Sequence, residues 1–253
     1  MEWTDEAIVL SARPHGEAAV VATLLTHSHG RHAGLVKGGR SSKQRGNLQP
    51  GNRVSARWRA RLADHLGSFT VEPVHNSSAA MLDDPLRLAC LVSACAVTEV
   101  ALPDREPHEP VFHGLAALLE ALETPLWAPA YVRWELGLLQ ELGFGLDLGT
   151  CAATGANDAL AYVSPRTGRA VSLSAGEPYR DKLLPLPGFL TGQAAARSGG
   201  LEEEVLAGLD LTGHFLDRHA LASRDTAMPA ARTASHRRLM GPMISRAGAH
   251  SPW

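Results

Sequence analysis

The sequence predicts an α+β protein, with a five-stranded β-barrel in residues 1–77 and a helical domain in residues 78–253. Three observations lead to this prediction. Short β-branched runs alternate with turn residues up to residue 75, long apolar helical runs dominate afterwards, and the balance of charge changes between the two parts. A chain of 253 residues with 45% hydrophobic and 20% charged residues is long enough for one or two globular domains.

Five short strands are expected in the N-terminal domain. Residues 38–50 are Gly, Ser, Lys, Arg, Gln, Asn and Pro with a single Leu, which predicts a mobile loop. After this loop, basic or polar residues alternate with apolar ones, as in a half-buried strand with Trp58 pointing inward and arginines outward. Five short strands favour a closed or nearly closed barrel over an open sheet with exposed edges. The expected strands comprise residues 7–12, 18–26, 33–37, 53–62 and 66–74.

The helical domain is expected to contain an irregular insertion at about residues 151–176. Gly, Ser and Pro interrupt the helical pattern there, and a short hairpin pairs residues 159–163 with 170–173. After residue 227 the chain is basic and interrupted by Pro and Gly, which predicts a flexible tail that frays near Gly241. The expected helices comprise residues 86–100, 111–122, 129–142 and 201–222.

The formal net charge of −2 hides a segregation of charge along the chain. Residues 1–75 carry +4, residues 76–225 carry −10 and residues 226–253 carry +4. No acidic residue lies between Glu17 and Asp64, and this stretch contains a run of basic residues. Such a run is either a solvated face or a surface for a polyanion, and its strand context favours nucleic acid. The candidate DNA-binding residues are Arg31, Lys37, Arg40, Lys43, Arg45, Arg53, Arg57, Arg59 and Arg61.

The residue types in this basic stretch predict how it binds. Arginine forms bidentate hydrogen bonds to phosphates, and these contacts do not depend on the base sequence. Aromatic residues are scarce in the barrel, and Trp58 and Phe69 point inward by their phase, which disfavours base stacking. Binding should therefore be electrostatic and leave the bases free to pair. Six phosphate contacts on single-stranded DNA would give a logarithmic salt slope of roughly −4.

Enzymatic and metal chemistry find little support in the sequence. It contains no phosphate-binding G-x-x-x-x-G-K-[ST] loop, no G-x-G-x-x-G after a strand and no nucleophile or metalloprotease motif, so we expect no enzyme and no cofactor. His27, His29 and His32 lie across a predicted turn without a nearby carboxylate, which favours solvated turn residues over a metal site. Cys90 and Cys95 are expected to pack in a helix core.

The sequence also predicts a cellular compartment. The chain has no long uncharged apolar stretch, and its first residues are acidic, unlike a secretory signal. With three cysteines at unrelated spacings, a cytoplasmic protein with reduced thiols and no membrane contact is expected.

Several segments, taken in this order, resemble the bacterial RecO family of recombination mediators across nearly the whole chain. Each is weak alone, but together they are specific. The segments are AIVLSARPHGE (7–17), LTHSHGRHAGLVKGGR (25–40), LQPGN (48–52), ARLADHLGSFTVE (60–72), RWELGLLQELGFGLDL (133–148), CAATG (151–155), YVSPRTGRAVS (162–172) and MPAAR (228–232).

The resemblance implies an OB-fold barrel, a helical domain and a non-enzymatic role in recombinational DNA repair. Such proteins bind single- and double-stranded DNA, anneal complementary strands coated with the single-strand binding protein SSB, and help RecR to load RecA. Some members hold zinc on four cysteines in the region matching 151–176. Only Cys151 remains here and Thr154 replaces the next ligand, so a zinc-finger-like but metal-free insertion is expected.

The resemblance also suggests where the C-terminal tail of SSB docks. Arg133 matches the basic residue that opens the R-[FW]-E-L helix, and Leu136 and Leu139 are candidates to line an apolar pocket beside it. An ordinary surface arginine is the alternative for Arg133. For the whole protein, the alternatives to a nucleoid-associated cytoplasmic mediator are an OB-fold RNA-binding or translation-associated protein and a scaffold that binds only proteins.

Overall fold

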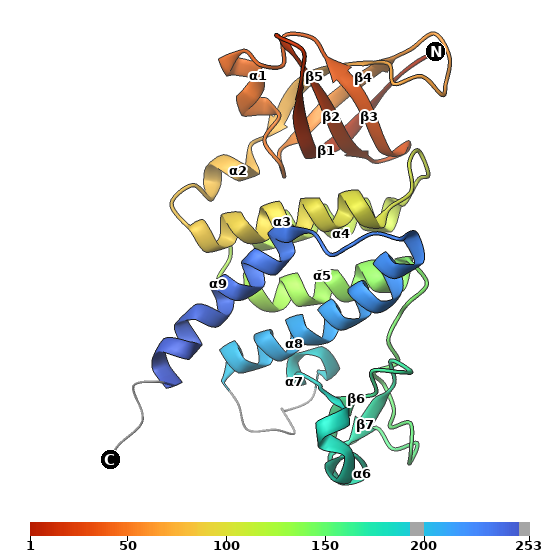
Figure 1. Ribbon diagram of the computed structural model, residues 1–253, viewed down its shortest axis with the longest axis vertical. Helices are drawn as coiled ribbons and strands as arrows, with labels where there is room; N and C mark the ends of the chain where they lie inside the picture. Colours follow the sequence, from red (N-terminus) through yellow and green to blue (C-terminus); the bar gives the residue numbers. More distant parts are fainter. Residues whose placement is uncertain (193–199, 248–253) are drawn as a thin grey trace. The chain divides into compact units, whose positions relative to one another are not determined.

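The computed structural model describes residues 1–192 and 200–247, and it confirms an α+β protein whose five-stranded N-terminal part is followed by helices (Figure 1). Contacts divide the chain into two compact units. The first comprises residues 1–124 and 229–235, and the second comprises residues 125–228 and the chain from residue 236 on. The first unit contains more than the barrel, and a domain boundary near residue 77 stays a prediction.

The barrel is closed by one short seam. Its strands pair in the order β1-β2-β3-β5-β4, and β4 pairs again with β1. The β3–β5 pairing is parallel and consists of two residue pairs, Leu35 with Ser68 and Val36 with Phe69. A five-stranded, partly open barrel is the architecture of the OB fold. The strands are β1 (Glu2–His15), β2 (Ala19–Thr26), β3 (Gly30–Val36), β4 (Arg53–Arg59) and β5 (Ser68–His75).

The predicted alternation along β4 is confirmed. Val54, Ala56 and Trp58 are buried in the barrel core, whereas Arg57 and Arg59 are exposed. The indole Nε1 of Trp58 donates a hydrogen bond to the Leu66 carbonyl at 3.0 Å, which satisfies its one polar atom. The strand ends at Arg59 rather than at residue 62, so the last part of the predicted alternation lies in the following loop.

The segment expected to be a mobile loop instead forms a short helix, α1 (Ser42–Asn47). The Ser41 side chain caps its first turn by accepting from the Gln44 amide. Leu48, the one apolar residue of the segment, is buried in the barrel core just after the helix. The Ser41 cap and the buried Leu48 explain why this segment is ordered, because burial of one leucine contributes about 2 kcal/mol to the free energy of folding.

Three further helices belong to the first unit: α2 (Ser77–Ala80), α3 (Pro85–Ala101) and α4 (Glu109–Ala121). The Asp84 side chain caps α3 by accepting from the amides of Leu86 and Arg87, and Pro85 opens the helix. Cys90 and Cys95 are buried in α3 as predicted, and burial raises the pKa of the Cys95 thiol to about 12.

The second unit is built around α5 (Trp127–Glu141) and α8 (Leu201–Phe215), which pack against each other. The predicted hairpin is confirmed as β6 (Leu160–Val163) and β7 (Ala170–Ser172), and β8 (Leu184–Pro185) extends it to three strands. The remaining elements are α6 (Leu173–Gly176), a 3-10 helix (Glu177–Lys182), α7 (Gly188–Thr191), a π-helical turn (Leu216–Leu221) and a 3-10 turn (Ala222–Arg224).

The C-terminal region contains a helix, α9 (Ala230–Ala247), where a flexible tail was expected. The helix passes through Gly241 without ending there. Gly lowers helix stability by about 1 kcal/mol relative to Ala, so a single internal Gly is compatible with a helix of this length. The last residues of the predicted tail, 248–253, lie outside the described part of the chain.

The thiol of Cys151 in the insertion is surrounded by hydrogen-bonding groups. Its Sγ accepts from the Ser172 amide at 3.2 Å and lies 3.5 Å from the Ser172 hydroxyl. Desolvation alone would raise the pKa of this thiol, but hydrogen bonds from Thr154 and Ser172 outweigh it and lower the pKa to about 6. All three cysteines are free thiols. Within residues 1–192 and 200–247, no helix is long and apolar enough to cross a membrane.

Candidate nucleic-acid interface

A groove with a cavity volume of about 360 Å³ lies over the β3–β5 seam of the barrel. Val36 and Phe69, which form part of the seam, lie in its wall. Lys37, just after β3, and Arg57 and Arg59 on β4 also line it. β5 runs between β3 and β4, so these cations stand on both sides of the seam. The groove therefore combines a small apolar wall with three basic side chains, which are the side chains that most often contact phosphates.

Gly34 explains how the seam and its groove form. A Cβ at this position would lie 2.5 Å from Cδ2 of Phe69, closer than real Cβ contacts. The missing side chain lets the Phe69 ring lie against β3, where it is buried in the barrel core. The sequence therefore positions the seam through a Gly and an aromatic residue on neighbouring strands.

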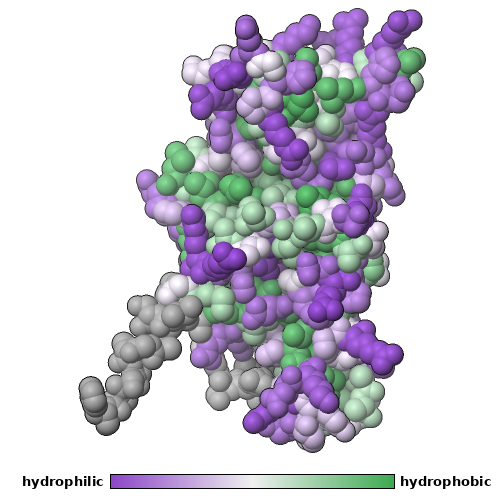
Figure 2. Space-filling view, viewed as in Figure 1, coloured by the Kyte–Doolittle hydropathy of each residue, from purple (hydrophilic) through white to green (hydrophobic). Residues whose placement is uncertain are grey.

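A second cavity, of about 520 Å³, lies on the other side of α1. Arg40 and Arg45 line it together with residues of β1 and β2. Gln44 lines the first groove and the adjacent Arg45 lines the second cavity, so α1 separates the two. Lys43 is exposed on the same helix. On the face drawn in Figure 2, hydrophilic side chains cover much of the barrel.

Two of the predicted DNA-binding arginines, Arg31 and Arg53, bind acidic or carbonyl groups within the first unit. Arg31 donates to the Glu99 carbonyl at 2.7 Å and pairs with Asp104 at 2.9 Å. Its side chain is only 20% exposed. The basic stretch contains no acidic residue of its own, but acidic side chains from other parts of the chain form ion pairs with its arginines. Arg31 is therefore a structural contact between β3 and the segment after α3.

Arg53 has a similar structural role. Its Nε donates to Glu6 at 2.9 Å, and a second nitrogen pairs with the same carboxylate. Glu120 on α4 lies 3.6 Å from it. With 28% of its side chain exposed, Arg53 ties β4 to β1 and α4 rather than facing solvent.

Arg57 is exposed but shares its charge with Glu2. The two side chains form an ion pair across the β1–β4 pairing. This hydrogen bond from Arg57 holds the pKa of Glu2 below its usual value, and the charge of Arg59 adds to the effect. Glu2 therefore occupies Arg57 in the way a phosphate would.

The remaining predicted cations are exposed. Lys37, Lys43 and Arg61 form no ion pair within the described part of the chain. Arg61 lies beyond the end of β4, in the loop that leads to β5. The structure thus brings Lys37, Arg57 and Arg59 together in one groove and Arg40 and Arg45 in another.

The aromatic residues of the barrel are largely covered. Trp3 is half-buried and stacks on His29, with ring centroids 4.1 Å apart and an angle of 7° between the planes. His29 is 2.9 Å from Asp5, and His32 is buried between Trp3 and Trp58. The prediction of solvated turn histidines without a nearby carboxylate is therefore wrong for all three, because His32 is buried, His29 faces Asp5, and Nε2 of His27 lies 3.6 Å from Glu109. Burial lowers the pKa of His32.

In the second unit, Arg133 is exposed on α5 but has a partner. It donates to the Phe189 carbonyl at 2.7 Å, and its guanidinium lies 5.8 Å from the centroid of the Phe189 ring. Leu136 is half-buried. Leu139 has no exposed surface, so it packs in the core rather than lining a surface pocket.

Sequence reasoning missed the acids that oppose the basic stretch and the polar residues that complete the groove. Gln44, Ser68 and Thr70 line the groove beside the three cations. Strand phase offered a signal for Glu2. In the β1–β4 pairing, Thr4 lies opposite Arg57 and Glu2 lies opposite Arg59. Glu2 is therefore on the same face of the sheet as Arg57 and is its diagonal neighbour.

Fold and groove together define the class: an α+β protein whose OB-type barrel carries basic grooves suited to phosphates. Comparison with known families identifies the family. A family model described as Recombination protein O N terminal matches residues 1–77, and one described as Recombination protein O C terminal matches residues 82–226.

Curated relatives agree with these family models. A protein named DNA repair protein RecO from Rhodospirillum centenum is 64% identical over 235 residues, covering 92% of each chain. Proteins of the same name from Caulobacter vibrioides and Rhodospirillum rubrum are 53% and 50% identical, each over 92% of this chain and over 95% and 94% of their own lengths. The chain belongs to the RecO family of DNA repair proteins, and its role lies in DNA repair and recombination.

Proposed function

We propose that this protein binds single- and double-stranded DNA through its barrel and anneals complementary strands, including strands coated with SSB. The groove over the β3–β5 seam carries this proposal, because Lys37, Arg57 and Arg59 converge there. Arg40, Lys43 and Arg45 extend the basic surface around α1. Arg31 and Arg53 are left out of this surface, since both are engaged within the first unit.

The proposed mechanism is electrostatic and involves no covalent step. Two DNA strands repel each other through their phosphates, and a surface that neutralises phosphates lowers this barrier to pairing. Trp58 and Phe69 are buried in the barrel core and the half-buried Trp3 is stacked on His29, which disfavours stacking with bases and leaves their pairing edges open. Neither an enzymatic activity nor a cofactor is part of the proposal.

The protein partners in this proposal follow from the family. We infer that the protein acts with RecR to promote RecA loading and that it works at the nucleoid in the cytoplasm. The acidic C-terminal tail of SSB is proposed to dock beside the exposed Arg133 and the half-buried Leu136, which are three residues apart on α5. The barrel of residues 1–77 is proposed to form the DNA-binding domain, and residues 78–253 the partner-binding domain.

Annealing of complementary oligonucleotides coated with SSB, without ATP, tests the proposed function. We expect the protein to accelerate annealing over SSB alone. No acceleration would contradict the proposal. A competition between single-stranded DNA and RNA of the same sequence tests its specificity, because a clear preference for RNA would favour an RNA-binding function instead.

The docking of the SSB tail is tested separately. Fluorescence anisotropy of a labelled tail peptide should show binding that Arg133→Ala weakens. Arg166→Ala removes another exposed arginine of the second unit and serves as the control. Equal affinity of both variants would contradict the assignment of Arg133 without affecting the proposal for the barrel.

A further inference from the structure

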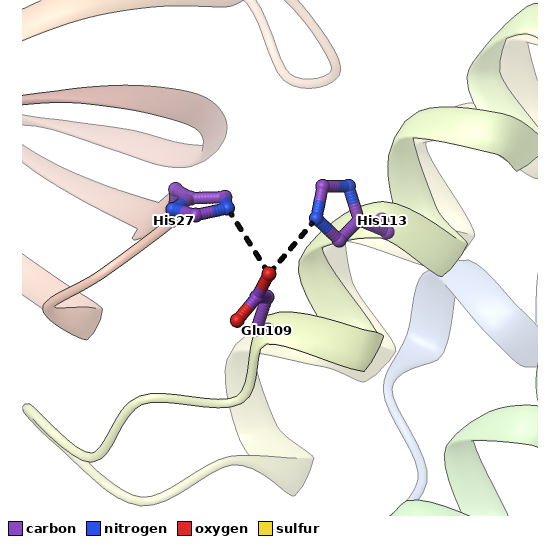
Figure 3. Close-up of side chains that lie close together, drawn as sticks. All are labelled: His27, Glu109 and His113. Carbon is purple, nitrogen blue, oxygen red and sulfur yellow. Dashed lines mark ion pairs between the residues drawn. The ribbon is translucent and has the colours of Figure 1, made fainter.

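Two histidines and one glutamate converge within the first unit, away from the basic grooves. His27 lies in the turn after β2, Glu109 begins α4, and His113 lies one helical turn further on. Their ligand atoms all lie within 4.8 Å of one another. Figure 3 shows both imidazole rings directed at the same carboxylate.

The local structure presents these side chains from two elements, the turn after β2 and the first turns of α4. Glu109 and His113 are four residues apart on α4, a spacing that places side chains on the same helix face. The His27 amide donates to the Glu6 carbonyl at 3.0 Å, which holds the turn against β1. The His27 ring packs edge-on against Phe112, with centroids 5.3 Å apart and an interplanar angle of 88°.

The second nitrogen of His27 has a partner of its own. Its Nδ1 lies 3.0 Å from the Ser28 hydroxyl, and its Nε2 faces Glu109. A histidine that ligates a metal commonly uses one ring nitrogen as ligand and holds the other in a hydrogen bond, which fixes the tautomer and the ring orientation. Donation from Nδ1 to Ser28 would leave the lone pair of Nε2 directed at the cluster.

The distances suit coordination better than direct hydrogen bonds. Oε1 of Glu109 lies 3.6 Å from Nε2 of His27 and 3.4 Å from Nε2 of His113. Both exceed the usual hydrogen-bond range of about 2.7–3.2 Å. Ligands bound tetrahedrally at about 2.0–2.1 Å from a metal are separated by about 3.3–3.4 Å. The two separations from Glu109 are therefore close to the edge length of a tetrahedral site, and the third, between the two histidines, lies within 4.8 Å.

We propose that His27, Glu109 and His113 bind a divalent transition-metal ion such as Zn²⁺. Imidazole ligands favour zinc, cobalt, nickel and copper, whereas Mg²⁺ and Ca²⁺ prefer sites made of oxygen. The side chains of His27, Glu109 and His113 are 36%, 64% and 61% exposed, so water completes the coordination. The bound ion would join the β2–β3 turn to the start of α4 and stabilise the first unit.

This site departs from the sequence-based expectation of no metal. The carboxylate and the second histidine lie more than 80 residues after the first, so the turn motif alone gave no ligand set. The position is also separate from the insertion that contains Cys151, which belongs to the second unit.

Cobalt titration of the full-length, untagged protein tests the proposal, because Co²⁺ reports its coordination by visible absorption. We expect saturation at one tightly bound Co²⁺ per chain, displacement by Zn²⁺ and no effect of Mg²⁺. His27→Ala, His113→Ala and Glu109→Gln should each weaken binding by at least about ten-fold. Zinc should also raise the unfolding temperature of the wild type but not that of the variants.

His75→Ala is the matched control, because His75 also lies 3.6 Å from a single glutamate, Glu123, and is 54% exposed. Its affinity for Co²⁺ should equal that of the wild type. Thermal unfolding of each variant without metal shows that it is folded, as its exposed side chains lead us to expect. Absence of saturable binding, or equal losses in His75→Ala and His27→Ala, would overturn the proposal.

Discussion

Replacing the three cations of the seam groove should change the salt dependence of DNA binding by a calculable amount. Each phosphate contact on single-stranded DNA contributes about 0.7 to the slope of log K against log salt concentration. Lys37 and Arg59 count fully, whereas Arg57 is shared with Glu2. The variant Lys37→Ala/Arg57→Ala/Arg59→Ala should therefore reduce the slope by about 1.4 to about 2.1.

The same reasoning gives the loss of affinity. If the salt plots of the two proteins meet at about 1 M salt, a slope change of this size weakens binding by about 25-fold to about 125-fold at about 0.1 M salt. Fluorescence anisotropy of a labelled oligo-dT over a series of salt concentrations measures both quantities. Because the contacts are with phosphates, a second oligonucleotide of mixed sequence should show the same change.

The second unit offers a control of identical composition. Arg166, Arg180 and Lys182 are exposed there, so replacing them by Ala removes one lysine and two arginines without touching the groove. This control should keep the slope of the wild type. An unchanged slope in the groove variant would refute the reasoning, as would an equal reduction in both variants, which would indicate that only net charge matters.

Three further outcomes are expected. Glu2→Gln should release Arg57 and strengthen DNA binding at low salt, with a slope that is steeper by at most about 0.7; weaker or unchanged binding would mean that Glu2 does not compete with phosphate. Gly30→Ala should lower the free energy of unfolding by about 3 kcal/mol, measured by urea denaturation, because φ is +67° and the new Cβ would lie 2.0 Å from a backbone oxygen. The ultraviolet absorbance of the Cys151 thiolate should rise with pH, with a midpoint near pH 6, and should be lost in Cys151→Ala. Because the pKa of Cys151 is lower in the folded state than in the unfolded state, its ionisation adds to the free energy of unfolding. This contribution is complete above the unfolded pKa and is lost as the pH falls through about 6.

Much of the barrel could be predicted from the sequence, because strand periodicity records which side chains face the core. The alternation around Trp58 placed β4 correctly up to the residue where the strand ends. The helix α1 was missed, because its Ser41 cap and the burial of Leu48 depend on contacts with the rest of the barrel. A short polar segment with one leucine has no periodicity that could reveal such an anchor.

The candidate site was predicted less completely than the fold. Residue type and strand phase predicted a basic outer face, and Arg57 and Arg59 are exposed on β4, but ion pairs engage Arg31 and Arg53 away from the groove. Their partners, Asp104 and Glu6, lie outside the basic stretch, and a sequence window cannot show that the chain returns to it. Charge runs therefore overstate the number of cations available to a polyanion.

The seam between β3 and β5 links ligand binding to the integrity of the barrel. Two residue pairs hold this seam, whereas seven or eight join each of the other neighbouring strands. The barrel should therefore open most readily beneath the groove that Lys37 and Arg59 flank. A DNA strand whose phosphates contact both cations would bridge the two sides of the seam. Its binding would then favour the closed barrel over the opened one.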